Sequence, residues 1–206
     1  MGTPSEAVGR IGVFGGTFDP PHIGHLLAAS EGLHAFELDR VLFVPAGRPW
    51  QKSTYAPAED RLMMTTLAIA GHTRFAVSRI ELDRRGPTYT VETLEAIAGS
   101  FPGSSLFFIA GMDAVADLGT WHRVTELAAL ADVIAVTRPS ATFDATSVPA
   151  EWPRVHAMEI PALDVSSTMI RQRVAKGEPI DFLVPDTVAR YIREQGLYVG
   201  GGSSDA

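Results

Sequence analysis

The feature that most constrains the fold of this chain is the regular alternation of short apolar runs with longer segments of helical periodicity. The apolar runs have the character of strands and cover residues 11–14, 39–47, 74–83, 105–111, 132–139 and 154–163. The segments between them place apolar residues at helical spacing and cover residues 22–36, 57–72, 89–101, 113–131, 166–177 and 185–198. Strands that alternate with helices in this way form βαβ units around a parallel sheet. We therefore predict an α/β fold, an open, doubly wound, Rossmann-like parallel sheet with helices on both faces.

Length and composition predict one globular domain. Of the 206 residues, 46% are hydrophobic and 20% are charged, the usual balance for a domain with a sizeable core. We assign a single domain to residues 1–206, with a folded core over about 11–198. The glycine- and serine-rich end, about 199–206, is expected to be disordered, and the polar stretch 140–153 to be a surface loop.

Cysteine content and charge exclude several classes of protein. The chain has no cysteine, so it has neither disulfides nor thiolate metal sites. Its net charge of −7, from 17 basic and 24 acidic residues, disfavours binding along a nucleic acid backbone. No apolar stretch approaches the roughly 18 residues that span a bilayer, and the first ten residues do not resemble a signal peptide. We expect a cytoplasmic protein without nucleic acid or membrane partners, and leave a homo-oligomer open.

Several of the predicted strands are followed by glycine, proline or arginine, namely Gly15–Gly16, Pro45–Gly47, Gly111 and Arg138. In doubly wound sheets, ligands bind at the carboxyl ends of the strands, near the switch in strand order. These residues are therefore expected along one edge of the sheet.

The first of these strand ends leads into the segment IGVFGGTFDPPHIGH, residues 11–25. If a helix begins near His22, the i, i+3 spacing places His22 and His25 on one face of its first turn. Backbone N–H groups at a helix start attract anions, and Gly24 would let a ligand approach the backbone. This combination resembles a phosphate cradle. Two alternatives stay open: a capping histidine beside an exposed one, or a zinc-chelating pair, although no third ligand is near in sequence.

Neither GxxxxGK[ST] nor GxGxxG occurs, so a P-loop kinase and a dinucleotide-binding dehydrogenase are disfavoured. Instead, GGTFDPPHIGH (15–25) resembles the first motif of the HxGH nucleotidyltransferases, and SSTMIR (166–171) resembles their second. Within that superfamily, the chain is most similar to the bacterial nicotinate-nucleotide adenylyltransferases. The similarity extends over about residues 11–198 and includes segments 43–52, 86–94, 107–114, Trp121 and 183–192.

The resemblance implies an enzyme of NAD biosynthesis that converts ATP and nicotinate mononucleotide to deamido-NAD and pyrophosphate. It implies that His22, His25 and Arg171 are catalytic, because they would neutralise charge on the phosphates. The ATP-binding residues that it implies are Gly15, Gly16, Thr17, Phe18, Gly24, Gly111, Asp113, Arg138, Ser166, Ser167 and Thr168. Mg²⁺ is expected to accompany the ATP phosphates without a metal site on the protein.

The acceptor side is implied in the same way. Nicotinate would stack on Trp121, and its carboxylate would lie near Thr90 and the amide of His122. The full set of acceptor-binding residues is Lys52, Thr88, Tyr89, Thr90, Trp121 and His122. Gln51 stands where the family commonly has histidine, and this puts phosphate contacts from that position in doubt.

Structural roles compete with some of these assignments. Thr88 and Thr93 are alternative helix caps, Asp113 is a candidate cap as well as a ribose ligand, and Asp19 is expected to shape the glycine loop through an Asx turn. Two other functions are also weighed. One is a related transferase for nicotinamide mononucleotide, phosphopantetheine or a CTP-linked alcohol, and the other is a nucleotide sensor without catalysis.

Overall fold

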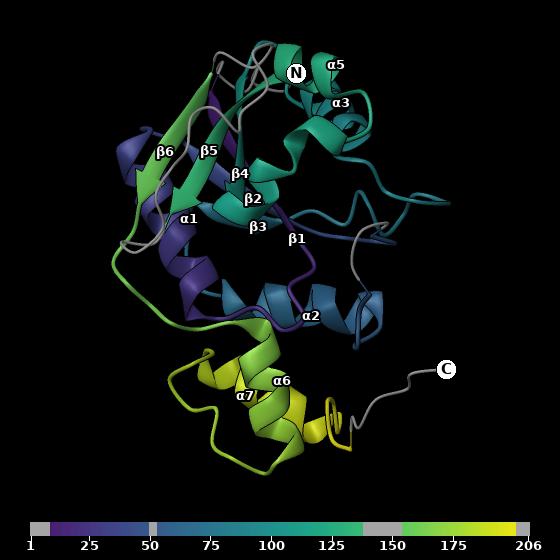
Figure 1. The fold of residues 1–206 in the computed structure, drawn as a ribbon, viewed down its shortest axis with the longest axis vertical. Helices are drawn as coiled ribbons and strands as arrows, with labels where there is room; N and C mark the ends of the chain where they lie inside the picture. The colour runs from purple at the N-terminus through teal and green to yellow at the C-terminus, as the bar shows by residue number, and fades with distance from the viewer. Residues whose placement is uncertain (1–8, 50–52, 138–153, 201–206) are drawn as a thin grey trace, which may run out of the picture.

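The structure, a computed structural model, describes residues 9–49, 53–137 and 154–200. Within these ranges a six-stranded, wholly parallel sheet has the strand order β3-β2-β1-β4-β5-β6 (Figure 1). Its strands are β1 (Arg10–Gly16), β2 (Arg40–Pro45), β3 (Phe75–Val77), β4 (Ser105–Gly111), β5 (Ala131–Thr137) and β6 (Val155–Glu159). The strand order reverses between β1 and β4, so the predicted doubly wound parallel sheet is confirmed.

Helices cover both faces of this sheet, because successive strand residues point to opposite sides. On β1, Phe14 joins a core with α1 (Ile23–Ala35), α2 (Ala58–Ala68), α6 (Ser167–Ala175) and α7 (Asp186–Glu194). Ile11 and Val13 join a second core on the other face. The elements that pack there are α3 (Thr90–Ser100), α4 (Met112–Ala116), the short 3₁₀ helix η1 (Leu118–Thr120) and α5 (Val124–Leu130). In Figure 1, α6 and α7 lie below the sheet, on the side where β5 and β6 end.

Two strands are shorter than their apolar runs predict. The third ends at Val77 rather than Asp83, because Asp83 N–H and side chain both turn back to Arg79. The last ends at Glu159, two residues before Pro161, which has no N–H to continue a ladder. The helical segment 113–131 divides into three short helices. The predicted loop 140–153, and the tail from residue 201, lie outside the described residues.

The strand-end residues predicted to share an edge do so where the structure describes them. Gly16 ends β1 opposite Pro45 of β2, and Gly111 ends β4 opposite Val136 of β5. Arg138 lies outside the described residues. Among the described helices, none is long and apolar enough to cross a membrane.

Candidate active site at the carboxyl edge of the sheet

A cavity of about 510 Å³ opens at the switch in strand order, between the ends of β1 and β4. Residues from four separate parts of the chain line it, and ten of these are predicted site residues. These ten are Gly15, Gly16, Thr17, His22, Gly24, His25, Gly111, Asp113, Trp121 and Ser166. The two motifs, far apart in sequence, therefore meet at one cavity through His22, His25 and Ser166.

The two histidines form a compact unit at the start of α1. Their ring centroids are 3.7 Å apart, with 31° between the planes. The backbone N–H of His22 donates to Nδ1 of His25 at 3.1 Å. A nitrogen that accepts a hydrogen bond carries no proton, so a neutral His25 has its proton on Nε2. The pair thus presents imidazole donors at the cavity wall.

Backbone amides contribute less at this helix start than its sequence predicts. The N–H of His22 is taken by His25, and the N–H of Ile23 donates to the carbonyl of Leu183 at 3.0 Å. Two donors that an anion would use are therefore already paired. Charge at this point must be met largely by the imidazoles.

Aromatic rings and a glycine fix the position of the histidine pair. Phe14 and Phe18 meet the His25 ring edge to face, at centroid distances of 5.9 and 5.1 Å. Phe18 is almost fully buried and does not line the cavity, so its contact is with His25. A Cβ on Gly24 would lie 3.1 Å from His22 Nδ1 and from Val165 Cγ1. The position between the histidines therefore excludes a side chain unless the ring moves.

The loop between β1 and α1 is held through Asp19, whose side chain is only 2% exposed. Its carboxylate accepts from Tyr55 N–H at 2.6 Å, Ala56 N–H at 3.2 Å and the Tyr198 hydroxyl at 2.6 Å. The expected Asx turn is therefore wrong in its geometry. Asp19 shapes the loop, but its partners lie 36, 37 and 179 positions away in the chain.

The second motif also holds this loop. The Ser167 hydroxyl donates to Pro20 O at 2.8 Å, and Arg171 donates to Asp19 O at 2.7 Å and to the Thr168 hydroxyl at 3.0 Å. Ser166 caps α6 by accepting from Met169 N–H at 3.2 Å. Of the predicted phosphate ligands in this motif, Ser166 lines the cavity, whereas Ser167, Thr168 and Arg171 do not.

On the acceptor side, Trp121 lines the cavity and packs edge-on against Phe108, with centroids 5.7 Å apart. Its indole Nε1–H is buried and has no hydrogen-bond partner among the residues that the structure describes. Tyr89 and His122 lie ring against ring at 4.4 Å, and Thr90 begins α3. None of these three lines the cavity, and Lys52 and Gln51 lie outside the described residues.

Thr88 and Thr93 do not cap α3. Thr93 donates to the buried carboxylate of Glu81 at 2.8 Å, and Thr88 also bonds to that carboxylate. Burial raises the pKa of Glu81 above its usual range, although these hydroxyls, the backbone of Gly47 and the charge of Arg84 oppose the shift.

A second buried charge is Arg61 on α2, which sequence analysis missed. Its guanidinium donates to Ala56 O at 3.2 Å, Thr17 O at 2.8 Å and Gly47 O at 3.3 Å. Burial lowers the pKa of Arg61, and the charge of Asp19 opposes that shift. A signal was present in the sequence, because Arg61 shares the helix face of the apolar residues Met64 and Ala68.

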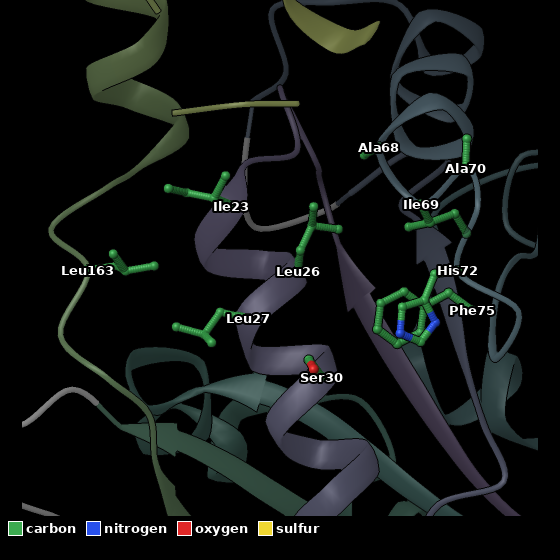
Figure 2. A pocket seen from close by; sticks show the side chains of 10 residues that line it. All are labelled: Ile23, Leu26, Leu27, Ser30, Ala68, Ile69, Ala70, His72, Phe75 and Leu163. Atoms are coloured by element: carbon green, nitrogen blue, oxygen red, sulfur yellow. The ribbon is translucent and has the colours of Figure 1, made fainter. Parts of the chain in front are cut away.

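A second cavity, of about 400 Å³, lies against the opposite side of α1 (Figure 2). Figure 2 shows Ile23, Leu26 and Leu27 of α1 at one wall, and the ring of His72 over that of Phe75 at another. Its lining is almost entirely apolar and includes neither motif histidine. The first cavity is therefore the candidate active site.

Comparison with known proteins gives the family of this chain. A family described as cytidylyltransferase-like matches residues 13–173. A Corynebacterium kroppenstedtii protein named "Probable nicotinate-nucleotide adenylyltransferase" is 51% identical over 199 residues, which cover 96% of this chain and 94% of that protein. A Streptomyces coelicolor protein of the same name is 52% identical over 188 residues, covering 90% of this chain and 99% of that protein.

Solved structures are similar in fold. Plasmodium falciparum nicotinic acid mononucleotide adenylyltransferase complexed with APC has a TM-score of 0.75 at 20% identity, over 92% of this chain and 97% of that one. The same enzyme complexed with NaAD also has a TM-score of 0.75, at 22% identity and the same coverage. At such low identity these likenesses support the fold alone. The matches in sequence show that this chain belongs to the cytidylyltransferase-like family, and within it to the nicotinate-nucleotide adenylyltransferases.

Proposed function

We propose that this chain transfers the adenylyl group of ATP to nicotinate mononucleotide, giving deamido-NAD and pyrophosphate in NAD biosynthesis. The observation that carries this proposal is the meeting of His22, His25, Ser166 and Trp121 at one cavity. The first three suit a polyphosphate, and the indole suits a flat pyridine ring. Relatives at about 50% identity carry the name of this activity.

In this reaction, an oxygen of the mononucleotide phosphate bonds to the α-phosphorus of ATP. The bond from that phosphorus to the bridging oxygen breaks, and pyrophosphate leaves with the electron pair. No protein nucleophile is required, so catalysis consists of positioning and charge stabilisation. The Nε2–H of His25 and the ring of His22 would donate to the triphosphate. The glycine-rich end of β1, with Thr17, and Gly111 with Asp113 at the end of β4, would hold the rest of ATP.

On the acceptor side, we assign the nicotinate ring to Trp121. The unpartnered Nε1–H of that indole is a donor that a bound ligand or water would satisfy. Thr90 and the amide of His122 would meet the carboxylate, with Tyr89 stacked behind His122. Lys52 and Arg138 are proposed as further phosphate contacts, and Thr88 acts through Glu81 rather than as a direct ligand.

Mg²⁺ fits this site as a companion of ATP. Asp113 is the one carboxylate among the described residues that line the cavity. No group of three or more His, Cys, Asp or Glu side chains within the described ranges is placed to hold a metal. A single carboxylate suits an ion held mainly by phosphate oxygens and water. When bound, the ion would neutralise phosphate charge.

Parallel rate measurements with nicotinate and nicotinamide mononucleotides test the proposal. We expect pyrophosphate release with ATP, and a higher kcat/KM for the acid than for the amide. A preference for the amide would instead indicate a related transferase that acts on nicotinamide mononucleotide. ATP binding without release of pyrophosphate in the presence of either acceptor would favour a nucleotide sensor without catalysis. We place this activity in the cytoplasm, on small-molecule substrates alone.

A further inference from the structure

We propose that Tyr198, in the segment after α7, is a positioning residue for catalysis that acts through the buried carboxylate of Asp19. This inference rests on the proposed function, because its effect is on the rate of adenylyl transfer. Tyr198 lies far from the HxGH motif in sequence and is not among the residues that line the cavity. Its hydroxyl nevertheless makes a 2.6 Å hydrogen bond to Asp19, three positions before His22.

Asp19 joins two loops of the site. One oxygen accepts from Tyr55 N–H, while the other accepts from Ala56 N–H and from the Tyr198 hydroxyl. The residues at 55 and 56 belong to the loop that leaves β2, and Asp19 itself belongs to the loop that leaves β1. Tyr198 therefore supplies the third hydrogen bond to a carboxylate that joins both.

The loop that carries His22 is held at three of its backbone carbonyls. Thr17 O accepts from Arg61, Asp19 O from Arg171 and Pro20 O from Ser167. The Asp19 side chain is the fourth point of attachment, and it also offsets the buried charge of Arg61. A weaker hold at this point would let the loop shift, and His22 and His25 would shift with it.

The backbone conformation and the packing of Tyr198 fix its position beside Asp19. Its backbone has φ +66°, a left-handed conformation that bulky residues rarely adopt. Its ring packs against the core, and its hydroxyl also contacts the sulfur of Met64 at 3.9 Å. Burial and the neighbouring Asp19 raise the pKa of Tyr198, so the hydroxyl keeps its proton and remains a donor.

The chain offers a matched control. Tyr191 on α7 also donates its hydroxyl to a carboxylate, Asp60 on α2, at 2.8 Å. Neither Tyr191 nor Asp60 lines the cavity, and the hydrogen bond between them involves no residue of the loop between β1 and α1. The variants Y198F and Y191F thus each remove one tyrosine–carboxylate hydrogen bond, but only Y198F removes one that reaches Asp19.

The experiment measures kcat and KM for both substrates in the wild type, Y198F and Y191F, together with stability in urea. We expect Y198F to lower kcat by about three- to tenfold, with both KM values within about twofold of wild type. Y191F should keep the wild-type kcat even if its free energy of unfolding falls as much as that of Y198F. An unchanged kcat in Y198F, or an equal fall in Y191F, would overturn the proposal.

Amide hydrogen exchange gives a readout that does not depend on turnover. In Y198F, the amides of Tyr55 and Ala56 should exchange about fivefold faster or more, and in Y191F they should not. Exchange in Y198F at the wild-type rate would overturn the proposal. If the wild type turns over neither pyridine mononucleotide, the proposed function fails, and the exchange comparison still decides whether Tyr198 holds this loop.

Discussion

At the scale of single residues, His25 shows how the fold prepares a donor. Its Nδ1 accepts from the backbone of His22, and the edges of Phe14 and Phe18 confine its ring. The tautomer and the ring position are thus set before any ligand arrives. A donor held in this way stabilises charge in the transition state without reorganising.

Replacing His25 with alanine should therefore lower turnover by about a hundredfold or more, on the scale of losing one preorganised donor. Steady-state kinetics measures the loss, and urea denaturation should show little change in the free energy of unfolding. His34 is exposed in the last turn of the same helix, and His34→Ala is the control. A His25→Ala protein that unfolds yet retains its specific activity would make the histidine structural.

Glu81 should impose a pH dependence on stability. Because its pKa is raised on folding, the folded state binds its proton more tightly than the unfolded state. Its stabilising contribution is full below the ordinary pKa of 4.5 and is lost as pH rises through the raised value. Glu81→Gln does not titrate, so the free energy of unfolding of the wild type should fall relative to the variant over that interval. Urea denaturation of the wild type and of Glu81→Gln at a series of pH values from acid to neutral measures this. A difference between their free energies of unfolding that does not change with pH would contradict it.

The sequence predicts some of these residues better than others. His22 and His25, which line the cavity, could be singled out because a short motif carries them, and Trp121, which also lines it, because of the family resemblance. Arg61, Glu81 and Tyr198 were missed because their roles depend on partners that only the fold supplies. Asp19 was correctly predicted to shape the glycine loop, but through a local turn. The sequence can suggest a local turn, whereas it cannot show a hydrogen bond to residue 198.

At the scale of elements, α6 acts as a brace for the loop between β1 and α1. Arg171 was expected to reach phosphate, but its guanidinium donates to Asp19 O and lies over the ring of Tyr55, 4.1 Å from the centroid. Ser167 makes a parallel contact to Pro20 O. The helix therefore contributes to the site by holding the loop as well as through Ser166.

Arg171→Ala should accordingly lower kcat by about tenfold or more, because a charge-assisted hydrogen bond to the loop is lost. Arg173 lies on the same helix but pairs with Glu178 and Pro179 O, away from the loop. Turnover in Arg173→Ala should stay near the wild-type value. Equal turnover in the two variants would argue against the brace.

Gly47, in the loop after β2, and Gly99, in α3, should respond to alanine in opposite ways. A Cβ on Gly47 would lie 2.3 Å from the backbone carbonyl oxygen of Glu81, so Gly47→Ala should destabilise by about 1–3 kcal/mol. Gly99 in α3 has nothing within 4 Å of such a Cβ, so Gly99→Ala should stabilise by about 0.5 kcal/mol. Thermal unfolding of both variants measures the signs, and two changes of the same sign would refute the contrast.

The elements themselves were largely predictable, because the apolar runs of β1, β4 and β5 and the amphipathic pattern of α7 are strong. The end of β3 was not, since the side chains of Arg79 and Asp83 turn the chain where the apolar pattern continues. The division of residues 113–131 also depends on packing, as Val115, Leu118 and Leu127 are each buried from a separate short helix.

At the scale of the whole molecule, the strand order places the two halves of the site on either side of the switch point. The histidine pair follows β1, and Trp121 follows β4, which is the neighbouring strand. The fold class and this edge were predicted from the alternation of elements. The family resemblance placed the start of α6 at the same site, but not the loop that it contacts. The position of the Tyr198 segment was not predicted, because no pattern in sequence states its partners.

ATP should stabilise the folded chain as a whole, since the cavity that it would occupy joins residues from β1, α1, α4 and α6. At a hundred times its Kd, a ligand adds about 2.7 kcal/mol to the free energy of unfolding. Thermal unfolding with and without MgATP should therefore show a raised Tm. No rise at saturating MgATP would contradict binding at this cavity.

The hydrogen bonds that hold the loop between β1 and α1 also affect when activity can begin during synthesis. All six strands end by residue 159, but Ser167, Arg171 and Tyr198 reach back to residues 19 and 20. A nascent polypeptide that has completed its sheet on the ribosome still lacks these three attachments. With Tyr198 in the role proposed above, adenylyl transfer at full rate waits until residue 198 has emerged, and a fragment that ends before it is less active.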